Sequence, residues 1–474
     1  MKNYRQFYID GQWIDSVHAC DFTVENPSTE QLIGVISLGS SDDVDIAVAA
    51  ARRAFASYAQ TSREARIALL EQLLAVYIDR CDEMAEAISL EMGAPIDFAI
   101  EDQAYCGRGH IEAALMALKT FEFKQKRQNA TIVREPIGVC GFITPWNWPI
   151  NQISCKVAPA LATGCTMLLK PSEIAPLSAQ IFSEMIHQAG IPAGVYNMIH
   201  GDGPGVGTAI SCHPDIDMVS FTGSTRAGRA VSHSAAESIK RVTLELGGKS
   251  PNIIFEDVDL EATVARGVND CMENVGQSCN APTRMLVPSQ LYTEAVAYAV
   301  KAASAIAVGR ADQPGAHIGP LVSRLQYNKV QDLIQTGIEE GARLVVGGLG
   351  KPEGFETGHF TKPTVFADVD NQMTIAREEV FGPVLVMIPF DSEQQAVDLA
   401  NDTPYGLAAY VNSNNEALVD RVTSQLRAGM VRVNGASHLF SSPFGGYKQS
   451  GNGREWGAFG FDDYLEIKAI SGGG

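Results

Sequence analysis

Hydrophobic and polar positions follow two different patterns along the chain, a helical one first and then an alternation of strands and helices. Ser41-Asp42 is a suitable N-cap for the alanine-rich run from Val44 to Ala59. Ser62 then begins an amphipathic segment that ends at Gly93, and a third helical run covers about Phe98 to Leu118. The polar interval that follows, Lys119 to Glu135, predicts a protruding loop or hairpin.

From Ile137 the pattern changes to short apolar strands separated by helices, with strands in IGVCGFIT, TMLLKPSE, DMVSFTGS and RVTLELGG. Such strands are typical of a parallel sheet that is covered on both faces. A second series of strands and helices starts near Ser250. We therefore expect an α/β fold with one unit ending near Gly247 and another running from Gly248 to about Gly445. Ligands of such sheets bind beyond the carboxyl ends of the strands.

Charge and composition exclude several classes of protein. The 474 residues include 36 Lys and Arg against 55 Asp and Glu, which gives a net charge of −19. This acidic balance argues against nucleic acid and anionic membranes as partners, because both favour a basic surface. The longest apolar run, Val139 to Ile150, is broken by two prolines and Asn147, and the first ten residues lack the apolar core of a signal peptide. We expect a cytoplasmic protein with two to four domains.

The nine cysteines do not form a recognisable framework. They lie far apart, no two form a C-x-x-C pair, and no two histidines are four residues apart. A disulfide scaffold and a metal site are therefore not expected. The default interpretation of each cysteine is a small buried side chain.

Cys279 differs from the other cysteines in its neighbours. It lies in GQSCNAPTR between a helix and a strand, flanked by small or polar residues, where a nucleophile could stand. A base is available in LELGGKSPN, where Glu245 ends an apolar strand and burial would raise its pKa. The alternative is an ion pair between Glu245 and Lys249. The two glycines after Glu245 favour the functional interpretation, because they allow close approach of another backbone or a ligand.

Asn147 lies in PWNWP, directly after a strand and between two tryptophans and two prolines. The prolines restrict the backbone, so the Asn147 amide could donate to an oxyanion. The alternative is an aromatic turn that only packs, and the motif alone favours that alternative.

Two further strings suggest a nucleotide site. FTGSTRAG follows a strand and begins a helix, where backbone amides could meet a pyrophosphate. Lys170 and Glu173 end another strand, and Glu173 could bind ribose hydroxyls. The chain has no GxGxxG motif; the alternating glycines from Gly201 to Gly207 have the wrong spacing.

Together these strings resemble the aldehyde dehydrogenase superfamily over essentially the whole chain. PWNWP, LLKPSE, FTGST, LELGGKSPN, GQSCNAPTR, REEVFGP and SPFGGYKQSGNGRE occur in the order of that family. The resemblance implies two Rossmann-like parallel-sheet domains, one for the cofactor and one catalytic, plus a small oligomerisation hairpin. The implied ranges are 1–118 and 137–247 for the NAD-binding domain, 248–445 for the catalytic domain, 119–136 and 462–474 for the oligomerisation element, and 446–461 for the return to the cofactor domain.

The resemblance also implies a mechanism. Cys279 would attack the aldehyde carbon, and Asn147 with the Cys279 backbone amide would hold the oxyanion. Hydride transfer to NAD would leave a thioester, which water activated by Glu245 would hydrolyse. Glu455 occupies the position of a second carboxylate that is sometimes implicated in a proton relay.

Most of the cofactor residues that the resemblance implies lie in the first unit, and two lie in the second. Glu173 would repel a 2′-phosphate, so NAD is favoured and NADP remains an alternative. The implied set is Ile143, Trp146, Lys170, Glu173, Gly203, Gly207, Gly223, Ser224, Glu379 and Phe381.

The resemblance leaves the aldehyde open. The substrate tunnel should be lined by Trp148, Gln152, Tyr105, Ser278, Asn280 and the loop 436–444. Trp148, Phe440 and Phe444 suggest an apolar or aromatic aldehyde, and no arginine except Arg108 is near enough in sequence to bind a substrate carboxylate. The partner besides the aldehyde would be a second copy, in a homodimer or homotetramer.

Three other functions are compatible with parts of the pattern. A CoA-acylating relative would resolve the thioester with CoA, but Glu at position 245 is untypical of that branch. A thiol esterase or amidase would use Cys279 and Glu245 without a nucleotide, against which the cofactor strings count. A non-catalytic protein on the same fold would not need Cys279, Glu245 and Asn147 together.

Overall fold

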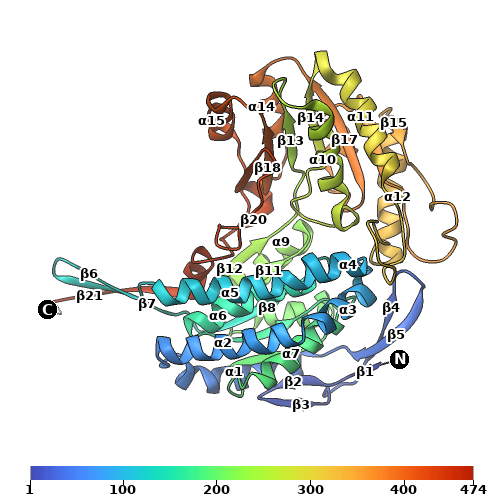
Figure 1. Ribbon diagram of the computed structural model, residues 1–474. Helices are drawn as coiled ribbons and strands as arrows, with labels where there is room; N and C mark the ends of the chain where they lie inside the picture. The colour runs from blue at the N-terminus through green and yellow to red at the C-terminus, as the bar shows by residue number, and fades with distance from the viewer. Residues whose placement is uncertain (1, 473–474) are drawn as a thin grey trace.

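The computed structural model describes residues 2–472 of the chain, so the first residue of the predicted range 1–118 and the last two of 462–474 lie outside the described residues. Two large sheets with their helices form the body, and a narrow antiparallel projection extends from one side (Figure 1). The α/β class with parallel sheets is as predicted. The domain boundaries stay a prediction. The pairing of the strands shows which of them form one sheet.

The first large sheet has eight strands in the order β20-β12-β11-β8-β9-β10-β2-β3. Its five central strands are parallel and completely or largely buried, since helices cover both faces. They are β8 (Val139–Ile143), β9 (Thr166–Lys170), β10 (Tyr196–Met198), β11 (Met218–Thr222) and β12 (Arg241–Glu245). Three short antiparallel strands complete the edges, β2 (Phe7–Ile9), β3 (Gln12–Ile14) and β20 (Gly451–Asn452).

The helices of this part agree with the pattern except at one break. Ser40, one residue before the expected cap, forms a capping box with Asp43 at the start of α1. The segment expected to run unbroken from Ser62 to Gly93 is two helices, because the backbone leaves helical geometry at Arg80. Nothing in the sequence marks this break, since Arg80 is neither proline nor glycine. The helices are α1 (Ser41–Tyr58), α2 (Arg63–Asp79), α3 (Cys81–Met92), α4 (Ile96–Phe98), a π-helical turn (Ala99–Ala104), α5 (Tyr105–Thr120), α6 (Pro149–Thr163), α7 (Leu177–Gln188), a second π-helical turn (Gly203–Gly207), α8 (Thr208–Cys212) and α9 (Thr225–Ala236).

The second large sheet has seven strands in the order β15-β16-β17-β14-β13-β18-β19, and only β15 is antiparallel. Its strands are β13 (Pro251–Ile254), β14 (Arg284–Pro288), β15 (Arg343–Val346), β16 (Thr364–Ala367), β17 (Val384–Phe390), β18 (Ala408–Asn412) and β19 (Met430–Val433). The helices around it are α10 (Leu260–Met272), α11 (Tyr292–Ala305), α12 (Arg324–Glu339), α13 (Thr374–Arg377), α14 (Glu393–Asn401) and α15 (Glu416–Gln425).

A three-stranded sheet near the N-terminus has no counterpart among the elements expected from the pattern. It consists of β1 (Lys2–Tyr4), β4 (Asp21–Asn26) and β5 (Gln31–Ser37) in the order β1-β5-β4. Side chains of this region reach the second part of the chain: His359 contacts Glu25 at 2.8 Å, and the Ala311 amide donates to Ser28 Oγ at 3.1 Å. The N-terminal segment therefore connects both large sheets.

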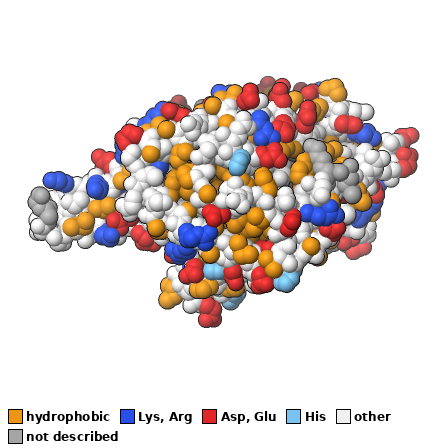
Figure 2. Space-filling view, turned by 90° about the horizontal axis from the view of Figure 1, so that it is seen from below, with side chains coloured by type: hydrophobic (Ala, Val, Ile, Leu, Met, Phe, Trp, Pro, Cys, Tyr) orange, Lys and Arg blue, Asp and Glu red, His pale blue; other side chains and the backbone are white. Residues whose placement is uncertain are grey.

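The projection is the hairpin expected in the polar interval. It pairs β6 (Lys124–Arg127), β7 (Ala130–Pro136) and β21 (Leu465–Ser471) in an antiparallel sheet, and β21 lies within the range 462–474 that the resemblance implied for this element. Figure 2 shows it extending from the body with both hydrophobic and basic side chains on its surface. Ile467 is 69% exposed and Ile470 44% exposed.

Two further findings concern the cysteines and the helices. All nine cysteines are free, but Cys20 and Cys212 are exposed, so the expectation of burial is wrong for these two. Among residues 2–472, no helix combines the length and the apolar character needed to cross a membrane.

Candidate active site

A cavity of about 190 Å³ lies where the carboxyl ends of β11 and β12 and the turn after β8 meet residues of the second part of the chain. Gln152, predicted for the substrate tunnel, lines it, and so do eight of the predicted catalytic and cofactor residues: Trp146, Asn147, Gly223, Ser224, Glu245, Cys279, Glu379 and Phe381. This is the place at which parallel sheets bind ligands.

Cys279 follows a 3₁₀ turn, Glu273–Gly276, whose residues Asn274 and Val275 have positive φ angles of 52° and 59°. Positive φ is costly for a β-branched residue, so the surrounding structure must hold this turn in place. Burial raises the pKa of the Cys279 thiol, and Glu379 and Glu245 raise it further, while backbone amides of Cys279 and Asn280 oppose the shift. The sulfur is therefore a thiol until a base or the substrate changes its surroundings.

Asn147 is held by a network of buried amides. Its Nδ2 donates to the Gln277 carbonyl at 2.9 Å, and its own carbonyl accepts from Asn274 at 2.9 Å and from Gln103 at 3.2 Å. Gln103 also donates to Asn274 Oδ1 at 3.2 Å. One Nδ2 hydrogen is engaged by Gln277, so the second remains for a ligand in the cavity.

The tryptophans of PWNWP pack as the alternative interpretation of the motif expected. Trp146 meets the Phe381 ring edge-on at 5.4 Å, and Trp148 meets Phe98 at 5.5 Å. The Trp148 indole donates to Ser278 Oγ at 2.8 Å, next to Cys279. The turn is thus an aromatic packing element and a rigid support for Asn147 at the same time.

Glu245 is 4% exposed, and neither of its carboxyl oxygens has a hydrogen-bond partner. Burial raises the pKa of this carboxyl well above its usual range, and the negative charge of Glu455 adds to the shift, whereas Lys156 and Arg454 oppose it. A Cβ atom on Gly445 would lie 2.7 Å from Glu245 Oε1, so the glycine leaves the carboxyl its space.

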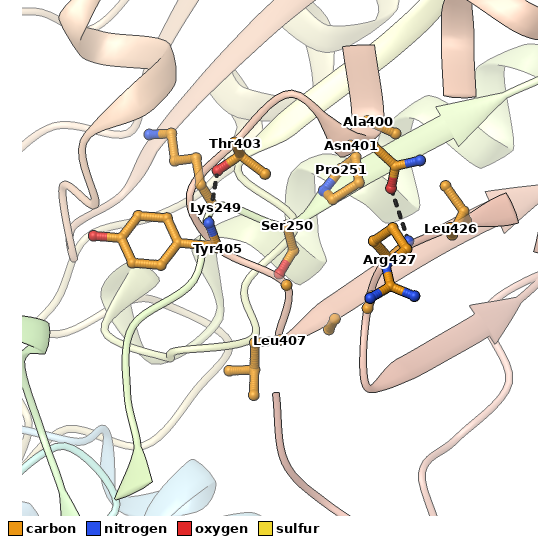
Figure 3. Close-up of a pocket in the computed structure, with 14 residues that line it drawn as sticks. Lys249, Ser250, Pro251, Ala400, Asn401, Thr403, Tyr405, Leu407, Leu426 and Arg427 are labelled. Atoms are coloured by element: carbon orange, nitrogen blue, oxygen red, sulfur yellow. Dashed lines mark hydrogen bonds between the residues drawn. The ribbon is translucent and has the colours of Figure 1, made fainter. Parts of the chain in front are cut away.

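The ion pair between Glu245 and Lys249, the alternative interpretation of LELGGKSPN, is not formed. The Lys249 ammonium is buried without a hydrogen-bond partner, and burial together with Arg284 lowers its pKa to about 7. Figure 3 shows Lys249 at a separate cavity of about 10 Å³; its dashed lines join Thr403 to Tyr405 and Asn401 to Arg427, and none reaches Lys249.

A buried ion pair lies near Glu245. The Lys156 ammonium pairs with Glu455 and donates to Thr222 Oγ1 at 2.8 Å. The second Glu455 oxygen accepts from the Cys155 thiol at 3.3 Å. The pair therefore places one negative and one positive charge close to the Glu245 carboxyl.

Five predicted cofactor residues lie outside this cavity, at or just after the ends of β8 and β9 and in the π-helical turn that follows β10. Lys170 pairs with Glu173 at 3.1 Å, and Ile143 is the register partner of Lys170. A Cβ atom on Gly207 would lie 3.9 Å from Ile143 Cδ1, whereas one on Gly203 would meet nothing within 4 Å. These residues thus extend the site from the cavity along the sheet edge.

Two residues of α12 complete the site and were not expected from the sequence. Gln326 donates to the Phe381 carbonyl at 2.8 Å, and Lys329 donates to the Glu379 carbonyl at 3.0 Å. Both line the cavity. They lie on an ordinary amphipathic helix, so no local signal distinguishes them from solvent-facing residues. Among the residues the structure describes, no group of His, Cys, Asp or Glu could hold a metal ion.

The fold and the site define the class of the protein: two parallel-sheet units that enclose a cysteine, a buried carboxyl and a fixed amide. The chain belongs to the aldehyde dehydrogenase family, whose model matches residues 13–470. It is 53% identical over 473 residues to the 3-succinoylsemialdehyde-pyridine dehydrogenase of a Pseudomonas species, covering 100% of this chain and 99% of that one.

Two solved structures are similar over the whole fold. An aldehyde dehydrogenase from Bartonella henselae has 51% identity and a TM-score of 0.98, covering 99% of this chain and 100% of that one. A mutant of aldehyde dehydrogenase C from Pseudomonas syringae, in complex with NAD⁺ and octanal, has 50% identity and a TM-score of 0.98, covering 99% and 96%. The resemblance in family and fold expected from the motifs is confirmed.

Proposed function

We propose that this protein oxidises an aldehyde to a carboxylic acid with NAD as hydride acceptor, through a thioester on Cys279. The observation that carries the proposal is that Cys279, Glu245 and Asn147 line one cavity together with Glu379 and Phe381. The solved relative from Pseudomonas syringae, with NAD⁺ and octanal bound, supports it.

The Cys279 thiol first gives its proton to a base, and Glu245 on the same cavity can take it and pass it to solvent. The sulfur, now a thiolate, adds to the aldehyde carbon. Negative charge then moves to the former carbonyl oxygen, where the free N–H of Asn147 and the Cys279 backbone amide stabilise it. The amide network around Asn147 makes this donor rigid, so little reorganisation is needed as the charge develops. Removal of hydride leaves a thioester, whose sulfur is a good leaving group for hydrolysis.

The residues present fit NAD. Glu379 is held in the cavity by the Gly248 amide at 2.9 Å, and a Cβ atom on Gly247 would collide with the Glu379 carboxylate. Gly223 and Ser224 lie directly before α9, which Ser224 caps, and the first amides of this helix suit a pyrophosphate. Lys170 and Glu173, which the sequence suggested for a ribose, lie further along the sheet edge. NAD, when bound, supplies the hydride acceptor.

Glu245 is the base for the second half of the reaction. Its raised pKa and its lack of any partner suit a group that must take a proton from water. This assignment also distinguishes the proposal from the CoA-acylating alternative, in which CoA would release the acyl group.

For the substrate we propose a neutral apolar or aromatic aldehyde. Phe444 and Trp456 stack at 4.7 Å in the cluster against which Cys279 packs, and Phe440 lies 5.5 Å from Trp456. Trp456 was not expected from the sequence as a substrate residue. The named substrates of two relatives, the pyridine semialdehyde and octanal, are likewise free of carboxylate.

A neighbouring cavity, which shares no lining residue with the active-site cavity, carries carboxyl groups. It has about 690 Å³ and includes Phe98, Asn274, Asp102 and Glu273, of which Asn274 also binds the Asn147 carbonyl. Burial and the nearby Asp102 raise the pKa of Glu273 to about 7, so it becomes negative above neutral pH. Arg108 lines neither cavity and pairs with Glu112 at 2.7 Å, so the structure does not place it as a clamp for a substrate carboxylate.

The decisive experiment is NAD reduction with simple aldehydes in the wild type and in Cys279→Ala. Loss of turnover is expected, whereas Cys81→Ala, a half-buried cysteine on α3, should retain it. Undiminished turnover in Cys279→Ala would refute the assignment of the nucleophile. A requirement for CoA would favour the acylating alternative.

Two further assays test the finer parts of the proposal. Glu173→Gln should relax the preference for NAD over NADP, because it removes the charge that opposes a 2′-phosphate; an unchanged ratio would show that Glu173 does not set it. Octanal and benzaldehyde should exceed succinic semialdehyde in kcat/KM, and the reverse order would contradict the proposed substrate class.

A further inference from the structure

Gln152, which the resemblance implied for the substrate tunnel, is a buried polar side chain in the active-site cavity, and the proposed reaction gives it no role so far. It lies on α6, is 4% exposed and lines the same cavity as Cys279 and Glu245. Its Oε1 atom is buried and accepts no hydrogen bond. An apolar side chain of the same length would fill this place without the cost of an unsatisfied amide.

Three buried oxygens of residues that line the cavity therefore have no hydrogen-bond partner, two on Glu245 and one on Gln152. The neighbouring protein donors are engaged elsewhere. Lys156 is bound to Glu455 and Thr222, and an Asn147 N–H is bound to the Gln277 carbonyl. A molecule that enters the cavity can supply the missing donor, and a cavity of about 190 Å³ has room for water.

We propose that Gln152 is a positioning residue for the hydrolytic water, which donates one hydrogen to Glu245 and the other to Gln152 Oε1. This inference rests on the proposed function, since it assigns the second contact of the water that Glu245 activates. With both hydrogens held by acceptors, the lone pairs of the water oxygen are left to face the thioester carbon.

The step balances within these groups. The water oxygen forms a bond to the thioester carbon, and its proton passes to the Glu245 carboxylate. The carbon–sulfur bond then breaks, the carboxylic acid is released, and the Cys279 sulfur leaves as a thiolate. Gln152 exchanges no proton; its amide oxygen accepts a hydrogen bond throughout.

The helix holds Gln152 rigidly enough for this role. Pro149 occupies the first turn of α6, the Gln152 amide donates to the Trp148 carbonyl at 3.0 Å, and every residue from Pro149 to Thr163 is buried. The same helix carries Lys156 one turn further on, so Gln152 and the lysine of the ion pair share one support.

The test uses Gln152→Met, which keeps the length of the side chain and removes the acceptor. Hydride transfer precedes hydrolysis, so the rapid first turnover of NADH should keep its rate. Steady-state kcat should then fall about tenfold, as expected for one lost hydrogen bond. KM should fall with it and leave kcat/KM unchanged, because only the step after the thioester is slowed. The amplitude of the first turnover of NADH gives the number of folded active sites.

Acyl-enzyme formed from p-nitrophenyl acetate isolates hydrolysis from the aldehyde and from NAD. Its breakdown should be slow in Gln152→Met and should be restored by hydroxylamine, a nucleophile stronger than water. The matched control is Gln180→Met on α7, since Gln180 is also buried, also has an unpartnered Oε1, and lies at a different cavity. Its kinetics should be those of the wild type.

Other outcomes overturn the inference. A raised KM with unchanged kcat would make Gln152 a substrate-binding residue, and a slower first turnover would place it in the steps before the thioester. Glu245→Gln in the same assays distinguishes a failure of the proposed function from a failure of the role assigned to Gln152. If that variant hydrolyses the acyl-enzyme at the normal rate, the proposed function fails; if it is slow while Gln152→Met is normal, only the role of Gln152 fails.

Discussion

The backbone carbonyl oxygen of Cys279 lies against Gly248, so close that a Cβ atom at position 248 would overlap it. The second glycine of LELGGKSPN thus sets the path of the backbone that carries the sulfur. The same residue donates its amide to Glu379 at 2.9 Å. One glycine therefore links the sulfur-bearing loop to a residue assigned to the cofactor.

Gly248→Ala should reduce kcat/KM by about 100-fold or more, because a shift of about 1 Å in a reacting group has that effect. The measurement is NADH formation under subsaturating aldehyde, with NAD binding followed separately. Gly460→Ala is the control, since its Cβ would meet only ordinary contacts of 3.4 Å and more. Equal activity of the two variants would show that the loop tolerates the displacement.

The pH dependence of hydrolysis should move when Glu455 is replaced by Gln. Glu245 acts as a base only when it is deprotonated, so the hydrolysis rate rises with pH through its raised pKa. Glu455→Gln removes a negative charge that raises this pKa and leaves Lys156, which lowers it, so the rise should occur at lower pH. The pH profile of acyl-enzyme breakdown measures the shift, with Glu466→Gln on the surface as control. A shift to higher pH would contradict the electrostatic account.

Arg284 should contribute strongly to stability. It is fully buried and donates to the carbonyls of Lys249, Leu399 and Ala400 and to Asn371 Oδ1. Arg284→Met leaves these acceptors without donors, at about 1–3 kcal/mol for each unsatisfied group. Denaturant unfolding measures the loss.

Arg343→Met is the matched comparison for Arg284. The pair of Arg343 with Asp368 is about half exposed on both sides, so its loss should change stability by about 0–1 kcal/mol. Equal midpoints for the two variants would show that the buried network of Arg284 adds nothing to stability.

The projection should carry the association of copies, which stays a prediction. Ile467 exposes 69% of its surface on β21, and apolar side chains in such a position are typical of an interface. Ile467→Glu should lower the molar mass measured by light scattering. Ile239→Glu, at a residue 92% exposed in the turn after α9, should not. An unchanged mass for Ile467→Glu would exclude this face as the interface.

Several features of the protein follow from the sequence alone. Apolar strands between helices indicated the parallel sheets, because burial on both faces requires near-continuous apolar residues. The polar interval indicated the hairpin, and Gly-Gly after Glu245 indicated a close approach, which Cys279 and Glu379 make. These features are local, so short strings of residues specify them.

Only the tertiary structure decided the remaining features. Gln326 and Lys329 are ordinary helical residues until folding places them on the backbone of Glu379 and Phe381. Whether Glu245 pairs with Lys249 was open in the sequence, and packing decided it by burying both side chains apart. The unsatisfied oxygen of Gln152 is likewise invisible in the sequence, because the absence of a donor depends on every element that surrounds the cavity.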